Sequence, residues 1–334
     1  HIADLRLRGG PVVNPFWAPP WKSLEPWQYR PSMASRYGQK LLAAIFGHNL
    51  CLGNFGEPSP EEQKAGLGSH GEAPVMRWRV VNKAAAGRAL KFAYGCDMPM
   101  AGMRLVRTIT SRKNSSIFRV SEAITNLSRR DVPFTMCEHV TFGPPFLERE
   151  VTIFDMPATK GHTFPGVFGQ PQRLRMNTAF EWPAGPGERG TVDLRKIQRA
   201  RNSDFSTQLI DPRRAIGWFS AVNPRLELLV AYVWKREDFP WVGNWEENYA
   251  RASAPWNRKS LTRGMEFANG PFPESVRDAV NRHRLFGAPT FAWLPARETI
   301  VMSYYIIARS VPNTCKGVAD IRRGDEGFEL DLIV

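Results

Sequence analysis

The feature that most constrains the fold is a succession of short alternating segments between Val75 and Val120. The segments MRWRVV, ALKFAYGC, RLVRTITS and SIFRVSE follow one another, with turn-forming residues between them. Segments of the same kind, FSTQLI, AIGWFSAV and LELLVAYVW, occur within residues 205–236. Parallel strands need long crossover connections, usually helices, and the sequence has no such rhythm. The pattern therefore predicts an all-β fold, a large antiparallel β-sandwich formed as a single domain by residues 1–334.

A few short helices are expected beside the strands. Residues 34–46 place apolar side chains at helical spacing and are followed by a glycine. Ser59, with a proline directly after it and Glu62 three residues on, forms a capping box for a helix over residues 60–65. Residues 273–286 predict a third helix that ends before a glycine.

One predicted hairpin delivers a histidine to the end of a strand. Residues 117–125 and 134–142 both alternate in polarity, and a polar turn that ends in proline separates them. A Gly-Pro-Pro sequence then stops the second strand, because proline cannot donate to a strand ladder. His139 lies near this strand end. Glu138 precedes it and must point to the opposite face of the sheet.

A glycine-rich loop, Gly66–Gly71, contains a second histidine. The loop formally matches G-x-G-x-x-G, but it follows a charged helix and no βαβ unit surrounds it, so a dinucleotide site is rejected. Glycine lets a ligand approach the backbone closely, which favours a ligand-facing His70 over a turn histidine bonded to the backbone. Glu72 is two residues on and is expected to share the same wall.

Tryptophans gather in the proline-rich N-terminal stretch, at Trp17, Trp21 and Trp27. Its prolines prevent the stretch from being a helix or a central strand throughout. Two interpretations remain open. The tryptophans form either an aromatic rim on which a sugar stacks, or a structural group that fills part of the core together with the prolines. Lys22 is the cation here that could reach a substrate hydroxyl.

A second aromatic stretch, Trp241–Trp256, combines tryptophans with carboxylates and is expected to be a loop. Glu246 and Glu247 lie between Trp245 and Tyr249. The stretch either faces a binding pocket or is a structural loop with solvent-facing acids.

Several of these segments together resemble the galactose mutarotase-like (aldose 1-epimerase) superfamily. The hairpin reads E-x-I-T-N-L-S…P…H-V-T-F-G-P-P-F-L, the glycine-rich loop reads G-S-H-G-E, and residues 260–275 read SLTRGMEFANGPFPES. The resemblance is closest to an uncharacterised aldose-epimerase-like branch. It implies the supersandwich fold of that superfamily, and a chain that starts one strand late relative to it.

The resemblance also implies a catalytic set. The family's general acid maps to His139, its general base to Glu266, and the histidine that contacts the substrate near the ring oxygen to His70. A carboxylate and a histidine suit anomer interconversion, because their pKa values can be tuned toward neutrality from either side. No metal or organic cofactor is required.

The substrate-binding residues are implied less sharply. Arg263 precedes Glu266 on the same predicted strand, and Trp245 lies in the region that faces the pocket in the resembled branch. The superfamily has a substrate-binding Asp near that region. Whether Glu246 or Glu247, if either, takes its role stays open.

Composition narrows the expected partners. The chain carries 45 Lys and Arg against 32 Asp and Glu, a net charge of +13, but it has no run of five cations. An acidic carbohydrate is therefore favoured over nucleic acid. No apolar run is long enough for a membrane span. The four cysteines lack a CxxC motif and are expected to be free and buried, which favours a cytoplasmic protein but leaves the periplasm open. A monomer or a homodimer is expected.

Two other functions remain open at this point. His70, Glu72 and His139 could form the two-histidine, one-carboxylate face of a cupin-type metal-dependent sugar isomerase or lyase. The eleven tryptophans equally fit a non-catalytic carbohydrate-binding protein.

Overall fold

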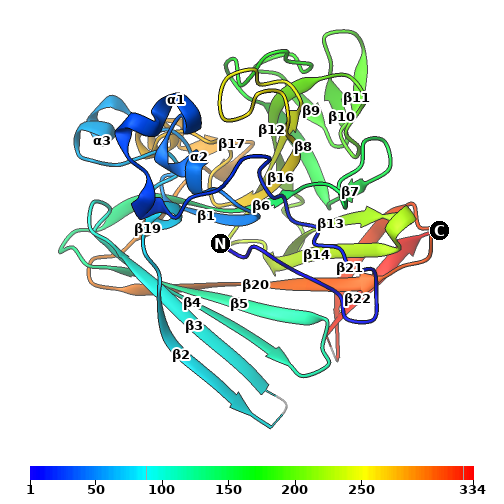
Figure 1. The fold of residues 1–334 in the computed structure, drawn as a ribbon, viewed down its shortest axis with the longest axis horizontal. Helices are drawn as coiled ribbons and strands as arrows, with labels where there is room; N and C mark the ends of the chain where they lie inside the picture. The colour runs from blue at the N-terminus through cyan, green and yellow to red at the C-terminus, as the bar shows by residue number, and fades with distance from the viewer. Residues whose placement is uncertain (88, 326) are drawn as a thin grey trace.

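Two large antiparallel sheets, stacked face to face, form the body of the protein (Figure 1). The computed structural model describes residues 1–87, 89–325 and 327–334. The first sheet has ten strands. In spatial order they are β1 (His48–Gly53), β6 (Val132–Phe142), β16 (Leu261–Ala268), β15 (Trp241–Asn248), β12 (Asn202–Ile210), β8 (Ala158–Thr163), β9 (Ala179–Glu181), β10 (Ala184–Pro186) and β11 (Thr191–Asp193), with β19 (Ala292–Leu294) paired to β6.

The second sheet has eight strands and lies along the lower side of Figure 1. Its order is β2 (Arg79–Ala86), β3 (Ala89–Met98), β4 (Met103–Arg112), β5 (Ile117–Asn126), β20 (Thr299–Ser310), β14 (Leu228–Lys235), β13 (Ile216–Asn223) and β7 (Ile153–Asp155). Two small pairs complete the strands, β17 (Arg284–Leu285) with β18 (Ala288–Pro289), and β21 (Gly317–Gly324) with β22 (Gly327–Ile333). The predicted all-β sandwich is confirmed.

The helices are short and peripheral, as expected. They are α1 (Ala34–Tyr37), α2 (Lys40–Ala44), α3 (Pro60–Lys64) and α4 (Val276–Arg282), with the 3₁₀ turns η1 (Pro26–Gln28), η2 (Pro31–Met33), η3 (Ala73–Val75) and η4 (Pro224–Leu226). The capping box at Ser59 is present in full. The helix expected over residues 34–46 is instead two short helices, because Gly38 between them has a left-handed φ of 72°. In the described ranges, none of these helices is long and apolar enough to cross a membrane.

The main hydrophobic core lies between the two sheets. Val140, Met265 and Phe267 of the ten-stranded sheet are fully buried there and belong to one cluster with Tyr232 and Tyr304 of the eight-stranded sheet. Residues at the alternate positions of the ten-stranded sheet therefore point the other way, toward α1, α2 and α3, which lie on its outer side in Figure 1. We call this the outer face of the ten-stranded sheet.

The prediction that residues 241–256 form a loop was wrong for the first half of the stretch. Trp241–Asn248 is β15, an internal strand paired with β12 on one side and β16 on the other. Its alternation places Trp245 on the outer face and Glu246 on the inner face. The sheet tolerates the Glu246 carboxylate because it is paired with the buried Arg263 and the partly buried Arg173.

Candidate functional site

Glu266 and His139, 127 positions apart in the chain, face each other directly in the sheet. Strands β16 and β6 pair so that Glu266 lies opposite His139. Directly opposed residues of an antiparallel pair project from the same face, so both side chains reach the outer face. His139 Nε2 is 3.1 Å from Glu266 Oε1. Glu138 points inward, where its carboxylate contacts His48 and Arg107, as the alternation predicts.

Two glycines make room for the Glu266 carboxyl group. Gly264 precedes it on the same face of β16, and a Cβ there would lie 2.4 Å from Glu266 Oε1. Gly243 lies opposite Glu266 on β15, and a Cβ there would lie 2.7 Å from the ring of Phe205 and 3.2 Å from Glu266 Cβ. The sheet thus leaves space around the carboxyl group where side chains would otherwise fill it.

The surroundings shift the proton affinities of this pair in opposite directions. Burial, with a contribution from Cys51, raises the pKa of Glu266 to about 8. Burial and the neighbouring His70 lower the pKa of His139 to about 3. His139 Nδ1 is hydrogen-bonded to Thr141 Oγ1 at 2.9 Å, which leaves Nε2 directed at the carboxyl group. At neutral pH the pair therefore holds one proton between the carboxyl oxygen and Nε2.

His70 reaches the same place from the glycine-rich loop. Its backbone N–H donates to the carbonyl of Gly56 at 2.9 Å, and Gly71 forms an isolated bridge with Leu52 of β1. His70 has a left-handed φ of 60°. A Cβ on Gly71 would lie 2.0 Å from the Leu52 carbonyl oxygen, so only glycine allows the loop to approach the strand this closely. The rings of His70 and His139 are 5.6 Å apart between centroids.

Cys51, on β1, contacts the far edge of the His70 ring. Its Sγ lies 3.0 Å from His70 Nδ1. Burial alone would raise the pKa of Cys51, but hydrogen bonding from Cys137 and the charge of His70 lower it to about 6. Burial would likewise lower the pKa of His70, but the charge and hydrogen bond of Cys51 raise it to about 9. All four cysteines are free and buried, as predicted.

These side chains open into a cavity of ≈ 310 Å³ on the outer face. Its polar lining consists of His70, His139, Glu266, Glu57, Arg251 and Gln39. The rest of the wall is aliphatic and aromatic, and it includes Leu41, Leu42, Ile45, Phe164, Val167, Phe168, Phe205, Trp245 and Trp256. A polar acid–base centre at the base of an aromatic wall suits a ligand with both hydroxyl groups and apolar C–H faces.

Arg251 is a cavity residue that sequence reasoning missed. Its guanidinium carbon lies 5.1 Å from the ring centroid of Trp256 and 5.6 Å from those of Trp245 and Phe168. Glu247 holds this arginine in place. The Glu247 carboxylate accepts the backbone N–H groups of Ala250 (2.7 Å) and Arg251 (2.9 Å), and its second oxygen lies 3.3 Å from Arg251 Nε.

Of the residues predicted around Glu246 and Glu247, only Trp245 lines the cavity. Glu246 and Arg263 lie on the inner face instead. They contact each other at 3.6 Å, and Glu246 also accepts from Arg173 at 3.0 Å. Both side chains are almost fully buried there, so a substrate in the cavity would have to cross the sheet to reach them. Their predicted substrate contacts have no support in this arrangement.

Three other predicted contacts lie outside the cavity lining. Glu72 is buried beside the loop and accepts the backbone N–H of Ala101 at 2.7 Å, so it does not share the wall with His70. Lys22 is exposed to solvent. Trp21 packs edge-on against Trp256 at 5.1 Å between centroids and donates to the Leu42 carbonyl, so it supports the wall from behind.

The two-histidine, one-carboxylate face of the cupin alternative does not form, because Glu72 is turned away from both histidines. Among the described residues, no group of three or more His, Cys, Asp or Glu side chains could hold a metal ion.

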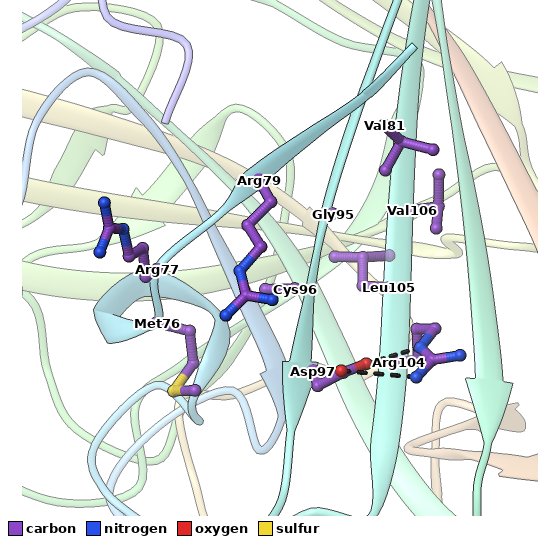
Figure 2. A pocket seen from close by; sticks show the side chains of 10 residues that line it. All are labelled: Met76, Arg77, Arg79, Val81, Gly95, Cys96, Asp97, Arg104, Leu105 and Val106. Atoms are coloured by element: carbon purple, nitrogen blue, oxygen red, sulfur yellow. Dashed lines mark hydrogen bonds and ion pairs between the residues drawn. The ribbon is translucent and has the colours of Figure 1, made fainter.

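A second hollow, of ≈ 330 Å³, lies on β2, β3 and β4 (Figure 2). Three arginines, at positions 77, 79 and 104, border it. Its carboxylate, Asp97, accepts from Arg104 Nε at 2.6 Å, so the acid is already paired. The hollow brings no histidine to this carboxylate, and it lacks the opposed acid and base found on the outer face.

Solved structures share this fold, although no family model and no curated protein match the sequence. A candidate aldose 1-epimerase from Klebsiella pneumoniae superposes with a TM-score of 0.61 at 12% identity, over 88% of this chain and 71% of that one. A galactose mutarotase-like protein from Clostridium acetobutylicum gives 0.55 at 11% identity, over 85% and 84%. The Slr1438 protein from Synechocystis gives 0.53 at 15% identity, over 79% and 78%. The chain therefore has the galactose mutarotase-like fold.

Proposed function

We propose that this protein, which has the galactose mutarotase-like fold, is an aldose 1-epimerase-like enzyme that interconverts the anomers of a sugar by opening its ring. The observation that carries the proposal is the direct opposition of Glu266 and His139, 3.1 Å apart, at the base of a cavity of ≈ 310 Å³. A carboxylate and an imidazole side by side can remove one proton while delivering another.

The number of protons that Glu266 and His139 hold together matches what the ring-opening reaction needs. In the empty site the shared proton lies on the Glu266 side, since burial raises the pKa of Glu266 and lowers that of His139. Transfer of this proton across the 3.1 Å contact gives a carboxylate and an imidazolium. The carboxylate then takes the proton of the sugar's C1 hydroxyl, and His139 gives its proton to the ring oxygen.

The C1–O5 bond breaks in that step, and C1 becomes an aldehyde. The pair still holds one proton, now on Glu266. Rotation about the C1–C2 bond presents the other face of the aldehyde, and the reverse transfers close the ring as the opposite anomer. No external proton donor is needed, because the pair carries the same number of protons before and after.

The rest of the cavity supports the proposal through binding. Trp245 and Trp256 offer aromatic surface to the C–H faces of a pyranose, and Arg251 offers N–H donors to its hydroxyl or carboxylate oxygens. His70 lines the cavity beside His139, and we assign it to the ring-oxygen side of the sugar, as the resemblance of the G-S-H-G-E segment implies.

Polarimetry on freshly dissolved α-anomers tests the proposal. The panel contains neutral hexoses and the corresponding uronic acids, because the cavity offers both a cation and a neutral aromatic wall. We expect faster decay of optical rotation than in buffer for at least one sugar, with the acceleration lost in Glu266→Gln. Failure to accelerate any anomer in the panel would refute the enzymatic proposal.

A second candidate, a non-catalytic carbohydrate-binding protein, is favoured by the aromatic wall alone. Calorimetric titration with the same sugars separates the two. Binding with no acceleration of mutarotation indicates the binding protein, and acceleration indicates the enzyme.

A further inference from the structure

We propose that Cys51 is a positioning residue for the sugar reaction, whose sulfur holds the Nδ1 edge of His70 so that the His70 Nε2–H is presented to the ring-oxygen side of the bound sugar. The inference rests on the proposed function and adds to it a residue from β1, a strand that bears none of the proposed acid–base groups. It makes His70 a fixed hydrogen-bond donor instead of a freely rotating ring.

The geometry separates the two nitrogens of His70. Nδ1 lies 3.0 Å from Cys51 Sγ, and Cys51 is fully buried behind the ring. His70 itself lines the cavity beside His139 and Glu266. Because Nε2 is on the opposite edge of the imidazole from the sulfur contact, it is the nitrogen available to a ligand.

The contact gives a donor at Nε2 in both forms expected at neutral pH, the neutral pair and the ion pair. If the thiol donates to Nδ1, the neutral ring must carry its hydrogen on Nε2. If a thiolate accepts from Nδ1–H, the ring is an imidazolium with hydrogens on both nitrogens. Both of these forms carry a hydrogen on Nε2. A neutral ring that donates Nδ1–H to the thiolate would leave Nε2 bare, and that form arises above about pH 9, where His70 loses its second ring proton.

Two adjacent links between the same segments keep the contact in place. Leu52 is joined to Gly71 by a backbone bridge, and the residues preceding each of them, Cys51 and His70, meet through their side chains. The bridge admits no side chain at Gly71, so the loop cannot slide along the strand without losing both links.

The surrounding charges favour the ion-paired form. The groups that face His70 are Cys51 from β1, Glu266 from β16, His139 from β6 and Glu57 from the loop after β1. Cys51 also faces Cys137, its partner in the β1–β6 register, whose hydrogen bond favours the thiolate. The pKa of Cys51 falls to about 6 and that of His70 rises to about 9, so thiolate and imidazolium coexist between these values.

The test combines kinetics with the spectrum of the His70 ring. The variants are Cys51→Ala, which removes the sulfur, and Cys51→Ser, whose hydroxyl can still donate to Nδ1 but does not ionise in this range. Cys315→Ala is the matched control, because Cys315 is an equally buried thiol in a separate cluster. Rates are measured by polarimetry from pH 5 to 10. Two-dimensional ¹H–¹⁵N spectra of the ring nitrogens give the tautomer and the pKa of His70.

We expect Cys51→Ala to lower kcat at least about tenfold at pH 7, with Cys51→Ser intermediate and Cys315→Ala unchanged. In the wild type the spectrum should show a hydrogen on Nε2 below about pH 9 and titration of His70 near pH 9, which Cys51→Ala should return toward its ordinary range. A bare Nε2 in the wild type at pH 7 would overturn the inference, and so would Cys51→Ala with unchanged kinetics and an unchanged His70 titration.

The spectrum keeps the two proposals distinguishable. The wild-type measurement needs no variant to fold and no sugar to turn over. An Nε2–H spectrum in a protein that accelerates no anomer would refute the proposed reaction, and with it the role of Cys51 in that reaction, while the pairing of Cys51 with His70 would stand.

Discussion

Replacement of Glu266 by Gln tests the acid–base pair through two independent quantities. The substitution keeps the size of the side chain and removes its ability to take a proton. We expect the rate of mutarotation to fall by about 10²–10⁴-fold, the usual contribution of a positioned general base. Binding of the sugar, measured by calorimetry, should change little, because the amide retains polar contacts with a hydroxyl group.

The same substitution should change the pH dependence of stability. The pKa of Glu266 is about 8 in the folded protein against 4.5 for the ordinary group. Between these values the folded state holds a proton that the unfolded state has lost, so the free energy of unfolding falls as pH rises. The full fall is roughly 5 kcal/mol, at about 1.4 kcal/mol per pH unit. Glu266→Gln lacks this fall and should gain stability relative to the wild type between pH 5 and pH 9.

Urea denaturation at pH 5 and pH 9, alongside polarimetry, provides the assay. Glu246→Gln is the control, since it removes a buried carboxylate from the adjacent strand on the inner face. It should lower stability without changing kcat. A wild-type rate in Glu266→Gln would refute the reasoning about the base, and a stability difference that is the same at both pH values would refute the raised pKa.

Three further predictions follow from the same geometry. Gly71→Ala should lower the free energy of unfolding by about 2 kcal/mol or more and abolish turnover, because the φ of Gly71 is 73° and the carbonyl oxygen of Leu52 lies 2.0 Å from the added Cβ. Gly68→Ala is the control, because the space around Gly68 is open, and it should behave as wild type in urea denaturation. Equal stability of the two variants would contradict this prediction. Glu247→Ala should raise KM about tenfold with little change in kcat, since Arg251 loses its ion pair and its backbone hydrogen bond, and the neighbouring Ala250 loses another. A changed kcat with constant KM would count against a binding role. In the wild type, kcat/KM should decline above about pH 8, where the Glu266 pair loses its proton, and a rate still rising at pH 9 would exclude that assignment.

Local sequence patterns were sufficient to predict several of the strands and helices. The alternation over residues 117–125 and 134–142 predicted β5 and β6, and the capping box predicted α3. The prediction of a loop over residues 241–256 was wrong for the first half of the stretch, where the dense carboxylates and tryptophans obscured the alternation of a strand. Recognising its alternation would have assigned Glu246 and Glu247 to opposite faces, so that signal was present in the sequence.

The sequence by itself determined the fold class and the presence of histidine and carboxylate residues on strands and a glycine-rich loop, because alternation, capping and turn chemistry act over neighbouring residues. The resemblance grouped His139, Glu266 and His70 as one catalytic set, but only the tertiary structure decided which side chains touch. The β6–β16 register brings His139 to Glu266, and the β1–loop bridge brings Cys51 to His70. Strand register and loop docking depend on packing across the whole sandwich, and no local pattern around either residue encodes the identity of its partner.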